Sequence, residues 1–172
     1  MRPTLRIYLP ALGYLYVGLA LVAFAIAGDH LRAAEAFFAV AGMAYVWFLG
    51  SLRARLMRYD PDGFFAAVVT LGGGAYLPLQ AAALVAKKVD LVALGSPAAA
   101  TVVVGSSLAA MHARKVPRWY GALGIVGGFA VLGVGAYEAA AHWTLAGTAL
   151  WASVLGFMVW VMAAATWLLA HP

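Results

Sequence analysis

Six apolar runs, separated by short polar or charged segments, divide the chain from Leu9 onward. Most are close to the roughly 20 residues that an α-helix needs to cross a hydrocarbon core of about 30 Å. Charged and turn residues place the runs at 9–27, 33–52, 61–86, 97–112, 117–138 and 145–169. The pattern predicts one all-α domain over residues 1–172, an integral membrane bundle of six transmembrane helices.

Proline marks the expected start of three of these helices. Asp60 precedes Pro61, Ser96 precedes Pro97, and Pro117 opens the fifth run without a capping residue before it. Proline is tolerated at the first helical position because its missing N–H would have no partner there, and Asp and Ser are favourable caps. We therefore expect helices to begin at these three prolines.

Composition favours a lipid environment over a soluble fold. The chain is 66% hydrophobic and 10% charged, whereas soluble domains are about 45–50% apolar and about 25% charged. Cysteine is absent, which excludes disulfides, thiolate metal sites and thiol catalysis.

The 11 Lys and Arg residues divide unevenly between the two expected membrane faces. Three lie on one face: Arg32, Lys87 and Lys88. Eight lie on the face that also holds both termini: Arg2, Arg6, Arg53, Arg55, Arg58, Arg114, Lys115 and Arg118. Because basic loops stay on the cytoplasmic side, we expect both termini in the cytoplasm and the protein in a cytoplasmic (plasma) membrane.

The basic clusters have two interpretations. They are either a topology signal alone or contacts to anionic lipid, which are worth about 1 kcal/mol per residue near the surface. The candidate contacts are Arg53, Arg55, Arg58, Arg114, Lys115 and Arg118. Nucleic acid is not an expected partner despite the net charge of +5, because the clusters are short and no basic domain is present.

Glycines recur along two of the expected helices. One set is Gly72, Gly73 and Gly74, and the other is Gly121, Gly124, Gly128 and Gly135. Spacings of three, four and seven place the second set along one helical face, where small residues let a neighbouring helix approach closely. We expect both sets to pack helices together, although the first set, near Pro78, is also compatible with a hinge.

The spans have no ionisable residue near their centres. This argues against proton pumping and against transport of charged substrates, because intramembrane charges usually mark such pathways. Gln80 is the most polar central side chain. With Tyr76 and Trp151 it forms a candidate ligand-binding set, and the alternative for Gln80 is a hydrogen bond to another helix.

His30, Glu138 and His142 lie near the outer membrane face. Imidazoles and carboxylates together are suitable ligands for a divalent metal, and two outer histidines also admit a haem. Solvated residues at the membrane surface are the alternative, so we predict no cofactor. The sequence contains no HExxH or GxSxG motif and therefore offers no catalytic constellation.

Three segments resemble parts of a family of multi-pass membrane proteins of unknown function from high-GC bacteria, especially actinobacteria. They are "FLGSLRARL", "GFFAAVVTLGGGA" and "VPRWYGALGIVGG". The resemblance covers the chain from about Ala39 to its end and implies a basic end of the second span before a glycine-rich third span. It implies no activity and no functional residues.

These features lead to a ranked set of functional hypotheses. The first is a non-enzymatic membrane protein that serves as an accessory or scaffolding subunit or binds a lipid or other apolar ligand. Its expected partners are membrane lipids and other membrane subunits or further copies of the chain. The alternatives are a transporter or channel for a small neutral or hydrophobic solute, and a membrane enzyme or redox protein using the outer histidines.

Overall fold

The computed structural model describes residues 8–60, 62–86, 89–114, 118–140 and 146–170, without the side chains of 89–94, 120, 135–140 and 146–152. In these ranges a short 3₁₀ turn, η1 (Leu9–Ala11), leads into six α-helices. The helices are α2 (Leu12–Ile26), α3 (Leu31–Leu56), α4 (Phe64–Ala86), α5 (Val89–His112), α6 (Arg118–Ala140) and α7 (Ala146–Ala170).

Four segments of the described chain are long and apolar enough to cross a membrane. They are Leu9–Ile26, Leu31–Leu56, Phe64–Ala86 and Ser153–Ala170. A helix suits hydrocarbon because it pairs its backbone N–H and C=O groups within the segment. The expected all-helical fold with membrane-spanning helices is therefore confirmed, and α6 adds a shorter apolar stretch, Gly121–Val134.

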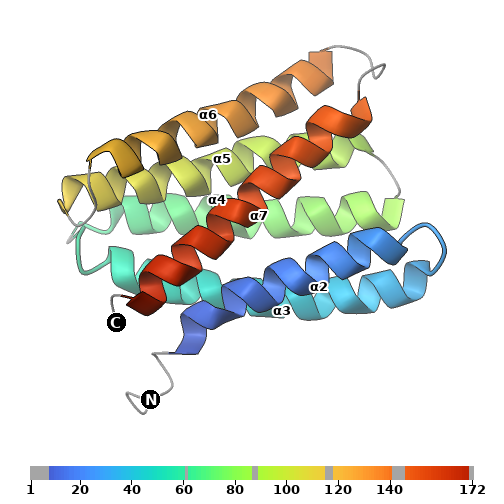
Figure 1. The fold of residues 1–172 in the computed structure, drawn as a ribbon, viewed down its shortest axis with the longest axis horizontal. Helices are drawn as coiled ribbons and strands as arrows, with labels where there is room; N and C mark the ends of the chain where they lie inside the picture. Colours follow the sequence, from blue (N-terminus) through green and yellow to red (C-terminus); the bar gives the residue numbers. More distant parts are fainter. Residues whose placement is uncertain (1–7, 61, 87–88, 115–117, 141–145, 171–172) are drawn as a thin grey trace.

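The helices form a bundle in which chain neighbours lie side by side (Figure 1). The most extensive pairs are α2 with α3, α4 with α5, and α5 with α6. α7 crosses the bundle diagonally, contacts α2, α5 and α6, and diverges from α6 toward the end where the chain begins and finishes. Short connections between long helices explain the up-and-down order.

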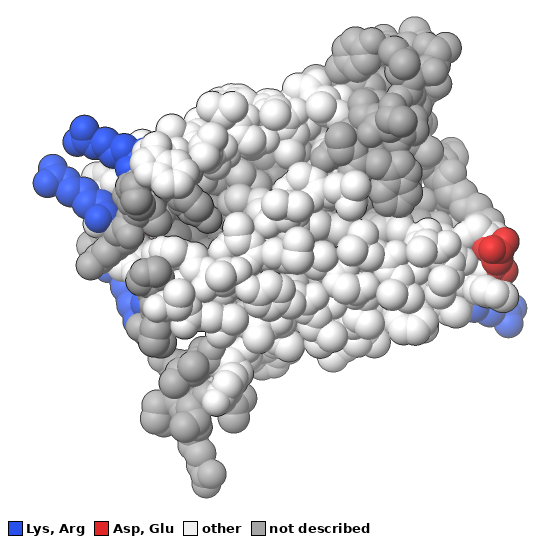
Figure 2. Space-filling view, viewed as in Figure 1, with Lys and Arg blue, Asp and Glu red and all other residues white. Residues whose placement is uncertain are grey.

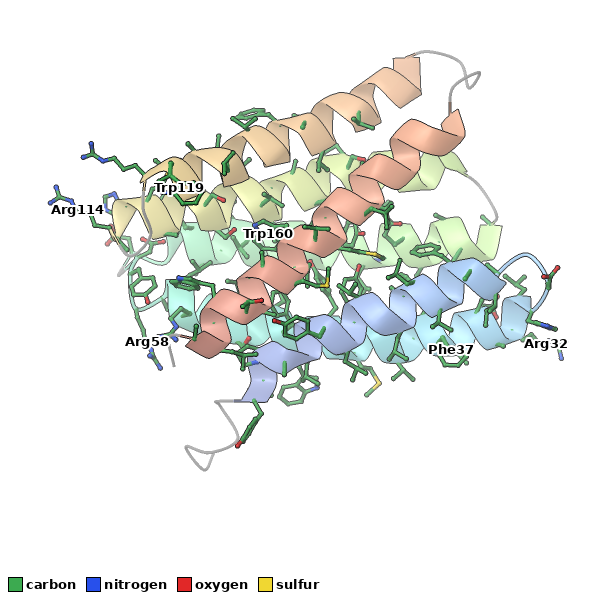
Figure 3. All side chains as sticks on the ribbon, in the orientation of Figure 1. Arg32, Phe37, Arg58, Arg114, Trp119 and Trp160 are labelled. Atoms are coloured by element: carbon green, nitrogen blue, oxygen red, sulfur yellow. The ribbon has the colours of Figure 1, made fainter. Side chains whose placement is uncertain are left out.

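On the face drawn in Figure 2, the charged side chains of the described residues gather at the two ends of the bundle. Figure 2 shows uncoloured sides between one basic end and an opposite end that carries acidic and basic residues. Arg58 and Arg114 lie at the first end, and Arg32 lies at the second (Figure 3). We call the end with Arg58 and Arg114 the basic end. The charge asymmetry read from the sequence therefore corresponds to a spatial asymmetry in the fold.

Aromatic rings fill the centre of the bundle. Tyr16 of α2, Tyr45 and Phe48 of α3, Tyr76 of α4 and Phe157 of α7 are all almost fully buried. The rings of Tyr76 and Phe157 are 4.5 Å apart at their centroids, and those of Tyr16 and Tyr45 are 4.8 Å apart. Tilted pairs at these separations are favourable, so four helices are held at one aromatic centre.

Hydroxyl side chains inside the spans bond to their own helices. Thr70 donates to the Ala66 carbonyl, and Ser107 donates to the Val103 carbonyl at 2.7 Å. The same pattern holds for Thr101, Ser106 and Thr166. This local bonding satisfies Ser and Thr hydroxyls in hydrocarbon, and Thr166 also shares a 2.6 Å hydrogen bond with the Tyr14 hydroxyl of α2.

The expected start of the fourth span at Pro97 is wrong. α5 begins at Val89 and continues through Pro97, which lies inside the helix and is exposed. A helix from Pro97 to His112 would be about 24 Å long, which is shorter than a hydrocarbon core of about 30 Å. The two additional turns before Pro97 make up this difference.

The expected cap at Asp60 is present, but the helix begins three residues later than expected. α4 starts at Phe64, after Gly63 adopts a left-handed conformation with φ of 72°. The Asp60 carboxylate accepts a 2.6 Å hydrogen bond from the Phe65 backbone N–H. The turn thus reverses the direction of the chain, and Asp60 satisfies one of the free N–H groups at the start of α4. Pro61 lies outside the described residues.

The three consecutive glycines of α4 have different surroundings. A methyl group at Gly72 would lie 3.0 Å from the Ala98 carbonyl oxygen of α5, and one at Gly73 would overlap the Leu49 side chain of α3. Gly74 has no such neighbour within 4 Å among the described residues. Close packing therefore involves the first two glycines, and the expectation does not hold for Gly74.

The glycines of α6 face α5. Methyl groups at Gly121, Gly124 and Gly128 would overlap Met111, Ser107 and Val104, respectively. Gly135 lies beyond the part of α6 whose surroundings are described. The absence of side chains at the first three positions lets the two helices run in direct contact.

Candidate functional site

Gln80 lies in the core between α4 and α5, and only 1% of its surface is exposed. Its amide nitrogen packs against the backbone of Gly95, where a methyl group would be 2.6 Å away. Neither the nitrogen nor the oxygen of this amide has a hydrogen-bond partner among the described residues. The expected bond from Gln80 to another helix is therefore absent from the described part of the chain.

Of the other two members of this expected set, only the Tyr76 side chain lies within the described residues. The Tyr76 side chain shares a hydrogen bond with Tyr16, so its hydroxyl is already occupied within the aromatic centre. The Trp151 side chain is outside the described residues. Gln80 and Tyr76 thus belong to the packed core, and they do not line either of the two spaces described below.

The expected metal ligands are not brought together within the described residues. His30 is exposed in the turn before α3. The Glu138 side chain and all of His142 lie outside the description. In the described ranges, His, Asp and Glu side chains form no group of three that would hold a metal ion.

The basic residues of α3, α5 and α6 surround one end of the bundle. Arg53, Arg58, Arg114 and Arg118 are exposed, and Lys115 is outside the described residues. Arg55 is partly buried, and its guanidinium carbon lies 5.8 Å from the centre of the Trp167 ring of α7. This cation–π geometry connects the basic end of α3 to the last turns of α7.

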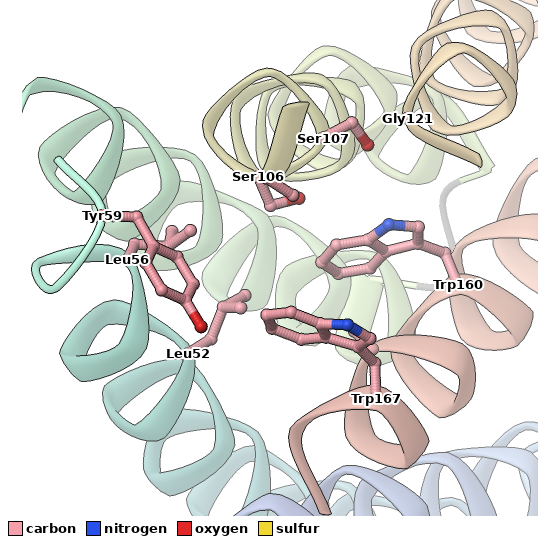
Figure 4. Close-up of a pocket in the computed structure, with 10 residues that line it drawn as sticks. Leu52, Leu56, Tyr59, Ser106, Ser107, Gly121, Trp160 and Trp167 are labelled. Atoms are coloured by element: carbon pink, nitrogen blue, oxygen red, sulfur yellow. The ribbon is translucent and has the colours of Figure 1, made fainter. Parts of the chain in front are cut away.

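A cavity of about 60 Å³ lies inside the basic end. Trp160 and Trp167 of α7 form one wall, and Leu52, Leu56 and Tyr59 form the opposite wall (Figure 4). Ser106 and Ser107 of α5 and Gly121 of α6 complete it. Four helices and the turn after α3 therefore contribute to this space.

The lining of the cavity is mainly apolar, and its two serine hydroxyls are already hydrogen-bonded. The Ser106 and Ser107 hydroxyls donate to backbone carbonyls of α5, so only their oxygen lone pairs remain available. The Tyr59 ring is held edge-on against Trp167, with ring centroids 6.3 Å apart. A cavity of this kind favours a largely apolar group.

A groove of about 450 Å³ opens beside this cavity, between α6 and α7. Leu123, Gly127 and Val134 form its α6 side, and Gly156 and Val159 are part of its α7 side. Its polar lining side chains are Ser107, at the floor on α5, and Ser153. The volume falls within the roughly 300–1,000 Å³ of typical ligand sites.

Small residues and the diagonal course of α7 create the groove. Gly127 has no described neighbour within 4 Å of a methyl group placed on it, and Gly156 has only Val131, at 3.9 Å. α7 diverges from α6 here, so the gap is not closed by helix contact (Figure 1). In hydrocarbon an apolar group would fill such a gap, because its walls would otherwise lose van der Waals contacts.

The groove and the cavity are adjacent because they share Trp160 and Ser107 in their walls. The Trp160 ring stacks on Phe157, with an interplanar angle of 16° and centroids 5.8 Å apart. This contact fixes the indole between the two spaces. The two spaces thus adjoin, one open on the exposed side of α6 and α7 and the other at the basic end.

Most residues that line the cavity and the groove were not predicted as site residues. Trp160 and Trp167, seven positions apart, share one face of a helix, but the sequence alone favours lipid contact or core packing for that face. The row of small residues at Gly124, Gly127 and Ala130 is the available signal. It does not reveal that α7 leaves a gap beside this row.

Comparisons with protein-family models, with curated proteins and with solved structures give no match to this chain. The inference of function therefore depends on the groove, the cavity and the charged ends described above.

Proposed function

We propose that this chain is a six-span protein of a bacterial cytoplasmic membrane that binds a lipid or another apolar molecule between α5, α6 and α7. In this proposal both termini face the cytoplasm, and the protein acts as a binding or accessory subunit without its own catalytic step. The observation that carries the proposal is the apolar groove of about 450 Å³ beside Trp160.

The position of the groove supports a lipid-class ligand. Leu123 and Val134, at the two ends of its α6 side, are about 16 Å apart along the helix axis, which is about half of a hydrocarbon core of about 30 Å. The lining residues Leu123 and Val159 are each 60% exposed, so the groove opens on the outer surface of the bundle. A molecule already dissolved in the bilayer reaches such a site directly.

The competing transport hypothesis has less support. A break in the third span near the possible hinge at Pro78 would favour it, but α4 is continuous across this residue. α5 is likewise continuous across Pro97. Transporters of the inverted-repeat class place their sites at broken helices, and the described helices do not provide one.

Filling the groove should displace the bound lipid. We expect Gly127→Leu to weaken lipid retention about tenfold or more, because accommodating a ligand against the added side chain costs about 1–3 kcal/mol. Bound lipid is counted by native mass spectrometry after purification in a mild detergent. Gly18→Leu is the matched control, because Gly18 of α2 is exposed and likewise has no described neighbour within 4 Å of an added methyl group.

The proposed function fails if wild-type protein retains no lipid or other apolar molecule under these conditions. It also fails if the Gly127→Leu and Gly18→Leu proteins retain the same amount as the wild type.

The absence of cysteine allows the proposed topology to be tested with single-cysteine variants. Asp62→Cys lies in the turn at the basic end, and Gly28→Cys lies in the turn at the opposite end. We expect a membrane-impermeant maleimide to label the Gly28→Cys protein in intact spheroplasts and to label the Asp62→Cys protein only after lysis. The reverse pattern would invert the topology, and labelling of both before lysis would contradict six spans.

A further inference from the structure

We infer that the ligand of the groove is an anionic phospholipid from the leaflet at the basic end, with an acyl chain along α6 and α7 and its phosphate near Arg114 and Arg118. This inference rests on the proposed lipid-binding function and adds the chemical class and orientation of the ligand.

The position of the groove along α6 indicates which way a bound lipid would point. Arg118 is the first residue of α6, and Leu123, the first groove residue, follows five positions later. This separation is about 8 Å along the helix axis, and helical periodicity places the two side chains on different sides of α6, so the long Arg118 side chain would extend around the start of the helix to reach a phosphate at the groove. The acyl chain of a lipid in the groove would then begin about one and a half turns from a guanidinium group at the membrane surface.

Charge complementarity sets the class of the headgroup. Arg114 and Arg118 are both exposed and flank the connection between α5 and α6, next to the start of the groove. Figure 3 shows Arg114 extending outward at this end, beside Trp119. Arginine presents several N–H donors in a fixed plane, which suits bidentate binding of phosphate oxygens. A zwitterionic phosphocholine headgroup also carries a phosphate, but its quaternary ammonium is repelled by the arginines, so a headgroup with net negative charge gains more from them.

The cavity beside the groove supports the same orientation. It lies at the basic end, shares Trp160 with the groove, and has Arg55 over its wall residue Trp167. Positive charge and an apolar space thus adjoin at this end of the bundle. At the basic end the exposed arginines outnumber the exposed Asp62, whereas at the other end the exposed Arg32 is offset by the exposed Asp29.

The test compares two lipids with identical acyl chains, phosphatidylglycerol and phosphatidylcholine, titrated into detergent-purified full-length protein and counted by native mass spectrometry. We expect the wild type to prefer phosphatidylglycerol. Replacing Arg118 by Gln should weaken phosphatidylglycerol binding about fivefold, the contribution of one basic residue near a membrane surface, and weaken phosphatidylcholine binding less, because the quaternary ammonium of that lipid already offsets its phosphate charge. Arg32→Gln is the control with the same charge change at the opposite end.

Each outcome decides between the proposals. Equal binding of the two lipids by the wild type would overturn the anionic assignment and leave the lipid-binding function intact. An equal loss in the Arg118→Gln and Arg32→Gln proteins would indicate diffuse attraction by net charge and would also overturn it. If Gly127→Leu fails to reduce phosphatidylglycerol binding, the groove is not the site. If the wild type binds neither lipid, both proposals fail. Melting temperatures within a few degrees of the wild type, checked for each variant, exclude misfolding as the cause of a loss.

Discussion

Replacing Gly72 by Leu is expected to destabilise the bundle by about 1–3 kcal/mol or more, the usual effect of overpacking a tight contact. The first added carbon would lie 3.0 Å from the Ala98 carbonyl oxygen and 3.1 Å from Thr101. A side chain can rotate away from such a contact, but a backbone oxygen cannot. α5 would therefore have to move away from α4 along their shared surface, which is one of the most extensive in the molecule.

Gly74→Leu is the control for this substitution, because Gly74 lies in the same helix, α4. Gly74 is exposed and has no described neighbour within 4 Å of an added methyl group, so the Leu side chain would extend into lipid. Replacing glycine in a helix interior also removes a propensity penalty of about 0.8–1.0 kcal/mol. We expect this variant to be as stable as the wild type or slightly more stable, as measured by unfolding in mixed micelles with a rising fraction of dodecyl sulfate. Equal destabilisation at the two positions would contradict the described α4–α5 contact.

Phe157→Ala is expected to lower the free energy of unfolding by about 2–3 kcal/mol. Phe157 is 1% exposed and touches Tyr45, Tyr76 and Trp160 through ring contacts. Lipid is as apolar as the core, so the transfer contribution that dominates in water is largely absent. The expected loss is the cavity contribution, about 24 cal/mol per Å³ for roughly 100 Å³ of missing side chain. The mixed-micelle unfolding assay measures it directly.

Phe129→Ala is the control for this substitution. Phe129 lies on α6 and is 60% exposed, so it faces lipid, and its removal should change stability by about 0.5 kcal/mol or less. The Phe157→Ala variant should also shift the Trp160 fluorescence, since the stacked partner of that indole is lost. Equal stability of the two variants would show that the aromatic centre does not hold the helices together.

The sequence determined the helices and the ends of the bundle. Apolar runs of sufficient length must form helices in lipid, because an extended strand would leave its backbone polar groups unpaired. The first and last predicted spans, 9–27 and 145–169, agree closely with Leu9–Ile26 and Ala146–Ala170. The expectation that three helices begin at proline was wrong at Pro97, which lies inside α5. At Pro97, the thickness of the bilayer outweighed the usual preference for proline at the first turn.

The sequence predicted only some of the contacts that the glycines of α4 and α6 make. Spacing along α6 correctly indicated that Gly121, Gly124 and Gly128 share a face, because helical periodicity is a local property. It did not separate Gly72 and Gly73 from Gly74. Consecutive residues of a helix point in different directions, and which direction faces a neighbouring helix is known only from the tertiary structure.

The tertiary structure alone decided the candidate site. Trp160 and Trp167 belong to α7, Leu52 and Leu56 to α3, and Ser106 to α5, and they meet because α7 crosses the bundle diagonally. The groove exists because that crossing leaves Gly127 and Gly156 without close neighbours. Local sequence determines which residues are small or apolar, but a gap between two helices depends on their crossing angle. That angle is set by the packing of side chains from several helices at once, so no single segment encodes it.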